Sequence, residues 1–154
     1  MTVAIDYQNA TEVTDLPPKK EFRRWTEMAL AGYRQHAELT IRLVDESESR
    51  RLNREFRGQD KPTNVLSFPV DIPIIVGSDL LGDLVICAPV VQREAAAQGK
   101  SERAHWAHMV VHGVLHLLGL DHRTDLEAAA MERVEAATLL KLGFSDPYLD
   151  NSAL

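Results

Sequence analysis

His112-Gly113-Val114-Leu115-His116-Leu117-Leu118-Gly119-Leu120-Asp121-His122 is the stretch that decides how this chain folds around its most informative side chains. His112 and His116 are four residues apart, so on a helix they lie on one face, about 6 Å apart along the axis. His122 comes six residues later, and on an unbroken helix it would lie near the opposite face. Gly119 can end the helix, because glycine tolerates the left-handed backbone conformation. The stretch therefore predicts a helix ending near Gly119 and a loop that returns His122 to the paired imidazoles.

Three histidine nitrogens with one open position form the ligand set of a catalytic zinc ion, whose bound water has a pKa of about 7. A structural zinc site is more commonly closed by cysteine. The single cysteine of the chain, Cys87, lies in the apolar run 84–87, which predicts a buried, inert side chain. We therefore predict one zinc ion, bound by His112, His116 and His122.

Two further histidines, His105 and His108, continue the same helical stripe toward the N-terminus. A second metal ion would need more acidic ligands nearby, so we expect these two side chains to pack against other helices or to face solvent. Considered alone, each histidine of the chain is best interpreted as an ordinary surface or core residue. The three at positions 112, 116 and 122 are distinguished by their spacing and by the glycine between them.

The histidine spacing is that of the metzincin peptidases, in which a third histidine follows a helical pair and a glycine. Those enzymes carry a glutamate directly after the first histidine, where it acts as the general base. This chain has Gly113 at that position. A zinc peptidase is therefore an alternative, not the leading hypothesis.

A second stretch, 52–69, carries basic side chains beside a predicted turn. Between residues 50 and 61 there are five basic and two acidic residues, whereas 120–154 has three basic and seven acidic ones. Four bases are spaced so that they would share one face if the helix reached that far: Arg50, Arg54, Arg57 and Lys61. Spacing alone leaves two interpretations open, a guanidinium beside a cleft and a solvated basic face.

The overall charge and the N-terminus restrict the class of protein. The formal net charge of −6 disfavours binding of nucleic acid over the whole surface, so any contact with nucleic acid would be local or helped by a protein partner. The first residues include Asp6 and Glu12 where a signal peptide would have a basic start and an apolar run. We expect a cytoplasmic protein that does not span a membrane.

The hydrophobic pattern predicts a single α+β domain over residues 1–154, with 146–154 as a loose tail. Four short strands are predicted, at 3–7, 39–44, 65–68 and 81–87, with a loop at 71–77. Five helices are predicted, the first after Pro17-Pro18 and the others over 45–56, 89–99, 101–118 and 124–142. Asp45 with Glu48, and Thr124 with Glu127, have the spacing of capping boxes. This mixture of elements favours a mixed sheet packed with helices over a helical bundle.

Taken with Leu81-Gly82-Asp83-Leu84-Val85-Ile86, the two stretches resemble the bacterial YbeY family of metal-dependent, single-strand endoribonucleases. The segments 112–122 and 62–69 (Pro62-Thr63-Asn64-Val65-Leu66-Ser67-Phe68-Pro69) are the ones specific to that family. The resemblance covers most of the chain. One departure is Leu120, where family members often carry tyrosine.

The resemblance implies a sheet of about four strands, zinc on the three histidines, and Arg57 as the functional arginine. We count Arg57 and His112 as the catalytic residues. A guanidinium suits this task because its planar fork can hold two phosphate oxygens. The resemblance also implies ribosomal RNA as substrate, the ribosome or its associated proteins as partners, and roles in maturation of the small-subunit RNA 3′ end and in ribosome quality control.

Several alternatives stay open at this level. The metal either activates a water for in-line attack or polarises the phosphate while the 2′-hydroxyl attacks. Asp121 either orients a ligand imidazole, takes a proton or is a turn residue. Besides the endoribonuclease, the chain is compatible with a zinc peptidase-like hydrolase and with a noncatalytic ribosome-associated protein whose zinc stabilises the fold.

Overall fold

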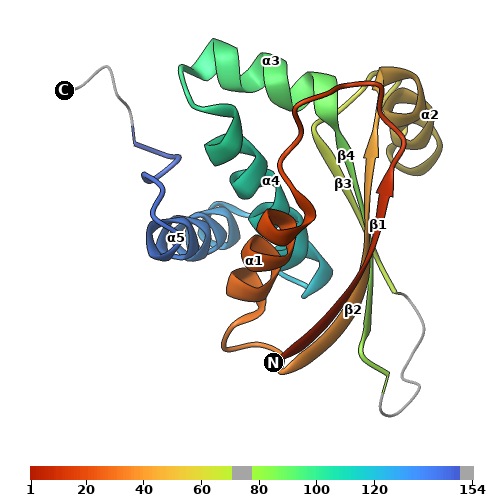
Figure 1. Cartoon of the computed structure of the whole chain (residues 1–154). Coiled ribbons are helices and arrows are strands. Elements are labelled where there is room, and N and C mark those ends of the chain that lie inside the picture. Colours follow the sequence, from red (N-terminus) through yellow and green to blue (C-terminus); the bar gives the residue numbers. More distant parts are fainter. Residues whose placement is uncertain (71–77, 150–154) are drawn as a thin grey trace.

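A four-stranded mixed sheet forms the centre of the computed structural model, which describes residues 1–70 and 78–149 (Figure 1). The strands are β1 (Thr2–Asn9), β2 (His36–Val44), β3 (Val65–Pro69) and β4 (Leu80–Cys87), in the order β1-β2-β4-β3. β2 is parallel to both β1 and β4, whereas β3 is antiparallel to β4. The predicted mixed sheet is confirmed, and its one antiparallel pair places β3 at an edge.

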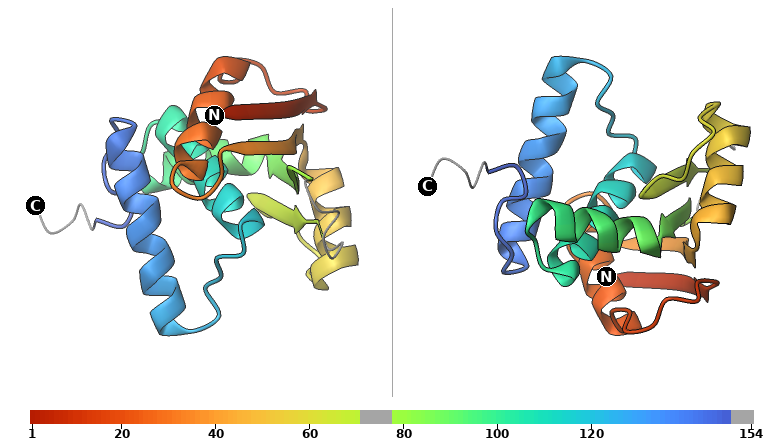
Figure 2. Two further views of the ribbon diagram at one scale, coloured as in Figure 1. Left: turned by 90° about the horizontal axis from the view of Figure 1, so that it is seen from below. Right: turned by 90° about the horizontal axis from the view of Figure 1, so that it is seen from above.

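Helices cover both faces of the sheet. Those in the described residues are α1 (Lys19–Leu30), α2 (Glu46–Arg57), α3 (Ala88–Gln98), α4 (Glu102–Leu117) and α5 (Asp125–Lys141). In Figure 1, α2 lies on one side of the sheet and α1, α4 and α5 lie on the other, with α5 outermost. The two views of Figure 2 show the same order of layers from below and from above. The predicted α+β architecture with five helices is thus confirmed for this part of the chain.

The alternation of side chains along the strands divides the core into two parts. Alternate residues of β2 and β4 point to the helical layer of α1 and α4 and form the large core: Leu39, Ile41, Leu43, Leu84 and Ile86. The intervening residues point to the α2 side and form a smaller core: Val44, Val85 and Cys87, with Leu66 of β3 and Val90 of α3. The prediction of a buried Cys87 is confirmed, since its side chain has no exposed surface.

Of the two predicted capping boxes, that of Thr124 forms its side-chain cap and that of Asp45 does not, while Ser101 caps α4. Ser101 Oγ accepts a hydrogen bond from Ala104 N at 3.1 Å, and Thr124 Oγ1 accepts one from Glu127 N at 3.1 Å. Helix α2 begins after Asp45 as predicted, but the capping box was wrong. The Asp45 carboxylate accepts hydrogen bonds from the hydroxyl of Thr11 and the backbone N–H of Glu12 instead, while Glu48 pairs with Arg42.

Helix α4 is the element around which the others pack. It contacts α1, α3, α5, β3 and β4. The helix lies close to the sheet at Gly113, where an added Cβ would lie 2.8 Å from Leu84 Cδ2 and 3.3 Å from Val65 Cγ2. A glycine at this position therefore lets the helix lie directly on β3 and β4, and it fixes how far the histidines stand from the sheet.

Some predictions fall outside these observations. The predicted loop 71–77 and the last residues of the expected tail, 150–154, lie outside the described residues. Within the described parts of the chain, no helix is both long and apolar enough to cross a membrane.

The contact at Gly113 predicts a large cost for any long side chain there. Gly113→Glu should lower the free energy of unfolding by at least about 3 kcal/mol, because it overpacks the interface and buries a carboxylate without a partner. Ala130→Glu, at an exposed position of α5, should change it by no more than about 0.5 kcal/mol. Urea denaturation followed by circular dichroism measures both. Equal midpoints for Gly113→Glu and wild type would contradict the packing described here.

Candidate metal centre

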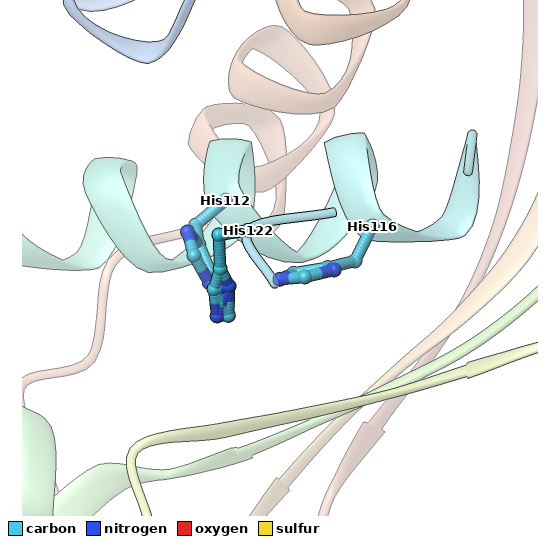
Figure 3. Close-up of side chains that lie close together, drawn as sticks. All are labelled: His112, His116 and His122. Carbon is cyan, nitrogen blue, oxygen red and sulfur yellow. The ribbon is translucent and has the colours of Figure 1, made fainter. Parts of the chain in front are cut away.

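The three predicted histidine ligands converge at the C-terminal end of α4 (Figure 3). His112 and His116 project from the same face of the helix, and their ring centroids are 4.6 Å apart. The helix ends after Leu117, and Gly119 has a φ of 99°. This left-handed residue turns the chain so that the ring of His122 comes to 4.9 Å from that of His116 and 5.7 Å from that of His112. The turn inferred from the spacing is therefore present.

The donor atoms of the three side chains suit a single metal ion. One ring nitrogen from each of His112, His116 and His122 lies within 4.8 Å of the other two. Burial lowers the pKa of His116, and the neighbouring charges of His112 and His122 lower it further. A low pKa keeps this imidazole neutral near pH 7, which is the form that binds a metal.

The triad lies in a cleft with a volume of about 960 Å³. One wall is β3 with the segment before it, and the opposite wall is the end of α4 with the loop that carries His122. Ser67 of β3 donates a hydrogen bond from its hydroxyl to the carbonyl of Gly113 at 3.2 Å, which links the two walls. The hydroxyl of Ser67 therefore bonds to α4 and not along its own strand.

Arg57 lines the same cleft as the three histidines. It is the last residue of α2, and no described carboxylate lies within 4.0 Å of its guanidinium. The prediction that four bases share one helical face is right only for the three arginines, which lie on α2. Asp60 binds Arg50 through two contacts of 2.8 and 3.1 Å and lies 3.8 Å from Arg54, and Lys61 lies beyond the end of the helix. Of the four predicted bases, Arg57 is the one placed beside the histidines.

Glu135 of α5 is the residue at this site that sequence analysis missed. Its side chain is 1% exposed, and Oε1 accepts a hydrogen bond from His112 Nδ1 at 2.6 Å. Oε2 accepts one from His108 Nε2 at 2.9 Å and another from the hydroxyl of Tyr148. Burial alone would raise the pKa of Glu135, but these hydrogen bonds and the charge of His112 outweigh it and lower the pKa to about 2. A carboxylate therefore stands behind the metal-facing ring.

The sequence did contain a signal for Glu135. Met131, Glu135, Thr138 and Leu139 are the buried residues of α5, and their spacing is that of one helical face. A glutamate on a buried helical face needs a partner inside the protein. Because α5 is rich in Ala and Glu, its composition does not distinguish Glu135 from the exposed Glu127 and Glu132 of the same helix.

The remaining polar candidates have structural partners. His105 and His108 are buried, so of the two expected environments, helix packing and solvent, packing is the one observed. His105 Nε2 lies 2.9 Å from a carboxylate oxygen of Glu94. Asp121 accepts a hydrogen bond from the backbone N–H of His122 at 2.8 Å, and its carboxylate lies 2.8 Å from Arg123 Nε. These contacts with the two following residues are those of a turn residue.

Taken together, the fold and the site define an α+β protein whose central helix carries three histidines able to bind a metal in an open cleft. Comparison with known families goes further, since the family model described as "Endoribonuclease YbeY" matches residues 4–143. The chain belongs to the YbeY endoribonuclease family. The resemblance drawn from the sequence is confirmed, and membership supports an endoribonuclease in ribosomal RNA processing, with RNA as the substrate.

A solved structure supports the fold. The chain is similar to the solution structure of TM1509 from Thermotoga maritima, with a TM-score of 0.55 and 23% sequence identity. The match covers 94% of this chain and 99% of that one. The architecture described above is thus found in an experimentally determined protein of nearly the same extent.

The geometry predicts that metal binding depends on the triad and not on histidine content. His116→Ala should abolish stoichiometric Zn²⁺ binding, because two imidazoles alone hold a zinc ion weakly. His36→Ala removes an exposed histidine at the start of β2 and should bind zinc as wild type does. Equilibrium dialysis followed by elemental analysis measures the zinc content of each. Full zinc content in the His116→Ala protein would contradict this assignment of the ligands.

Proposed function

We propose that this protein is a cytoplasmic, zinc-dependent endoribonuclease that cleaves single-stranded RNA in maturation of the small-subunit ribosomal RNA 3′ end and in ribosome quality control. The observation that carries the proposal is that Arg57 and the three histidines line one cleft. Membership of an endoribonuclease family supplies the substrate class. The ribosome or proteins associated with it are the proposed partners, and the assignment of residues 1–154 to a single catalytic unit is part of the proposal.

The donor set supports zinc as the metal. Three neutral imidazoles form the protein part of a catalytic zinc site, and no described cysteine lies among them to close it. A zinc ion there would supply positive charge to offset the charge of a phosphodiester and to activate the attacking oxygen. His112 enters the proposal as a ligand that binds through Nε2, since its Nδ1 donates to Glu135.

Arg57 is proposed to bind the phosphate that is cleaved. Its guanidinium has no carboxylate partner among the described residues, so its donors are available to an incoming anion. The planar fork can hold two phosphate oxygens and stabilise charge that develops during the reaction. The cleft would therefore offer two kinds of positive group to one phosphate, a metal ion at the end of α4 and the guanidinium of Arg57 at the end of α2.

The aromatic residue next to Arg57 supports single-stranded RNA as the substrate. Phe56 is 63% exposed and lines the cleft with Phe68, whose ring centroid lies 5.1 Å from its own. The edge contact with Phe68 holds Phe56 in place and leaves its ring accessible. An unpaired base can stack on such a ring, whereas a base inside a duplex is already stacked between its neighbours.

Two other functions are less well supported. In a peptidase of the metzincin type, the general base would occupy position 113, but that position is a glycine packed against Leu84 and Val65. For a noncatalytic zinc protein, a closed coordination sphere would be expected, whereas the triad faces an open cleft. The endoribonuclease uses both the cleft and the arginine.

Substitution of Arg57 should separate catalysis from metal binding. Arg57→Ala should lower kcat for a single-stranded RNA about 10²- to 10³-fold, because a charge-stabilising donor is lost. Arg57→Lys should recover only part of this, since an ammonium cannot bind two oxygens as a fork. Zinc content should stay at the wild-type level in both variants.

Arg51→Ala is the matched control for Arg57, since Arg51 is an exposed arginine of the same helix and lines a separate hollow. This variant should cleave RNA at nearly the wild-type rate. Initial rates with a fluorescently labelled RNA measure all three, and a peptide pool is assayed in parallel. Unchanged cleavage by Arg57→Ala would contradict the role of that arginine, and cleavage of peptides alone would overturn the proposed function.

Removal of the exposed ring should weaken substrate binding more than turnover. Phe56→Ala should raise KM for single-stranded RNA roughly tenfold, since stacking of one base contributes about 1–3 kcal/mol. Tyr33→Ala, which removes an exposed aromatic ring outside the cleft, should leave KM unchanged. Steady-state kinetics with unstructured RNA gives both constants. Equal KM values for Phe56→Ala and wild type would show that the base does not stack there.

A further inference from the structure

His112 differs from the other two histidines of the triad in how its ring is held. Its Nδ1 lies 2.6 Å from Glu135 Oε1. Among residues 1–70 and 78–149, the ring nitrogens of His116 and His122 have no hydrogen-bond partner in the protein. The orientation of one ligand is therefore fixed by the fold before any metal binds, while the other two can adjust to the ion.

The contact with Glu135 also determines which nitrogen of His112 carries the proton. A carboxylate only accepts hydrogen bonds, so His112 Nδ1 must carry the hydrogen. In the neutral ring, Nε2 is then unprotonated, with its lone pair directed away from Glu135. This is the nitrogen that a metal in the triad requires.

The Glu135 carboxylate is itself fixed by groups from two other parts of the chain. His108 Nε2, one helical turn before His112 on α4, lies 2.9 Å from Oε2. Tyr148, which follows α5 in the segment expected to be a loose tail, donates its hydroxyl to the same oxygen. The side chain of Glu135 is only 1% exposed, so water has little access to it. Both carboxylate oxygens accept hydrogen bonds from the protein.

We propose that Glu135 is the positioning residue of the metal centre, and that it holds His112 in the tautomer and orientation that bind the metal. His108 and Tyr148 fix the carboxylate, so the segment after α5 contributes to the site although it does not reach the cleft. The inference rests on the metal-binding triad of the proposed function, and it adds a role that the matched family does not by itself assign to a residue.

Glu135→Gln is the main test, because glutamine has nearly the same shape but its amide can donate to His112 Nδ1 and favour the wrong tautomer. Zn²⁺ affinity is measured by competition with a chromophoric chelator, and the variant should bind zinc about 10- to 100-fold more weakly than wild type. In the Co²⁺-loaded protein, the visible absorption bands should change in position or intensity, which reports ligand geometry independently of activity.

Helix α4 provides a matched control. His105 of α4 and Glu94 of α3 form a second histidine–carboxylate contact of 2.9 Å, away from the triad. Glu94→Gln should keep the zinc affinity within about twofold of wild type and leave the Co²⁺ spectrum unchanged. If both glutamine variants weaken zinc binding equally, the effect is one of general packing and the positioning role is overturned. It is also overturned if Glu135→Gln binds zinc as wild type does.

A readout without metal separates this inference from the proposed function. The ¹⁵N chemical shifts of the His112 ring in the metal-free protein should report the Nδ1–H tautomer in wild type and a changed tautomer population in Glu135→Gln. If wild type binds no zinc, the proposed function fails, while this measurement still decides the role of Glu135. An Nε2–H tautomer in wild type would overturn the inference.

Tyr148→Phe keeps the proposal testable if Glu135→Gln does not fold. It removes one donor to Glu135 and leaves the carboxylate and both histidines in place. We expect a smaller loss, a few-fold in zinc affinity, with urea denaturation confirming a folded protein. If Glu135→Gln is unfolded and Tyr148→Phe retains the full affinity and the wild-type His112 tautomer, the proposed chain from Tyr148 through Glu135 to His112 is refuted.

Discussion

The close contact between α4 and the sheet at Gly113 is the constraint on which the rest of the structure depends. A helix that lies directly on β3 and β4 can be reached by solvent only along a narrow strip, and eleven of its sixteen residues are buried. The partly exposed positions near its C-terminal end include His112 and His116. Packing on one face therefore determines which side chains can reach the cleft. The same packing excludes a glutamate at position 113, because Leu84 and Val65 occupy the space that its side chain would need.

Burial of α4 also requires that its polar side chains find partners inside the protein. Unpaired polar groups in a low-dielectric interior cost free energy, whereas paired ones fix a single arrangement. Glu94 of α3 serves His105, and Glu135 of α5 serves both His108 and His112. Helices α3 and α5 thus each contribute one carboxylate to the buried histidines of α4. The metal centre uses the second of these contacts, so the same interaction that satisfies a buried helix also orients a ligand.

Much of the fold followed from short-range patterns in the sequence, and the exceptions have physical reasons. The predicted elements 65–68 and 81–87 agree with β3 and β4 to within one residue, because alternating apolar runs bounded by turn residues specify a strand locally. β2 begins at His36, three residues before its prediction, since pairing with Thr2, Val3 and Ala4 of β1 extends it toward its N-terminus. The triad was readable because its geometry depends on one helix and one glycine. The role of Glu135 could not be predicted, because its partner His112 lies 23 residues away in the sequence. Their contact arises only when α5 packs on α4.

The charge distribution explains how an acidic chain can present a site for an anionic polymer. With a net charge of −6, long-range attraction does not draw RNA to the surface as a whole, so the attractive groups must be local. Asp60 forms an ion pair with Arg50 and lies near Arg54. Its carboxylate therefore reduces the positive charge on the outer face of α2. Arg57, one turn further, has no such partner among the described residues and lies at the cleft. An arginine without an ion-pair partner among the described residues therefore lies in the same cleft as the triad, where binding of a phosphate and its cleavage would coincide.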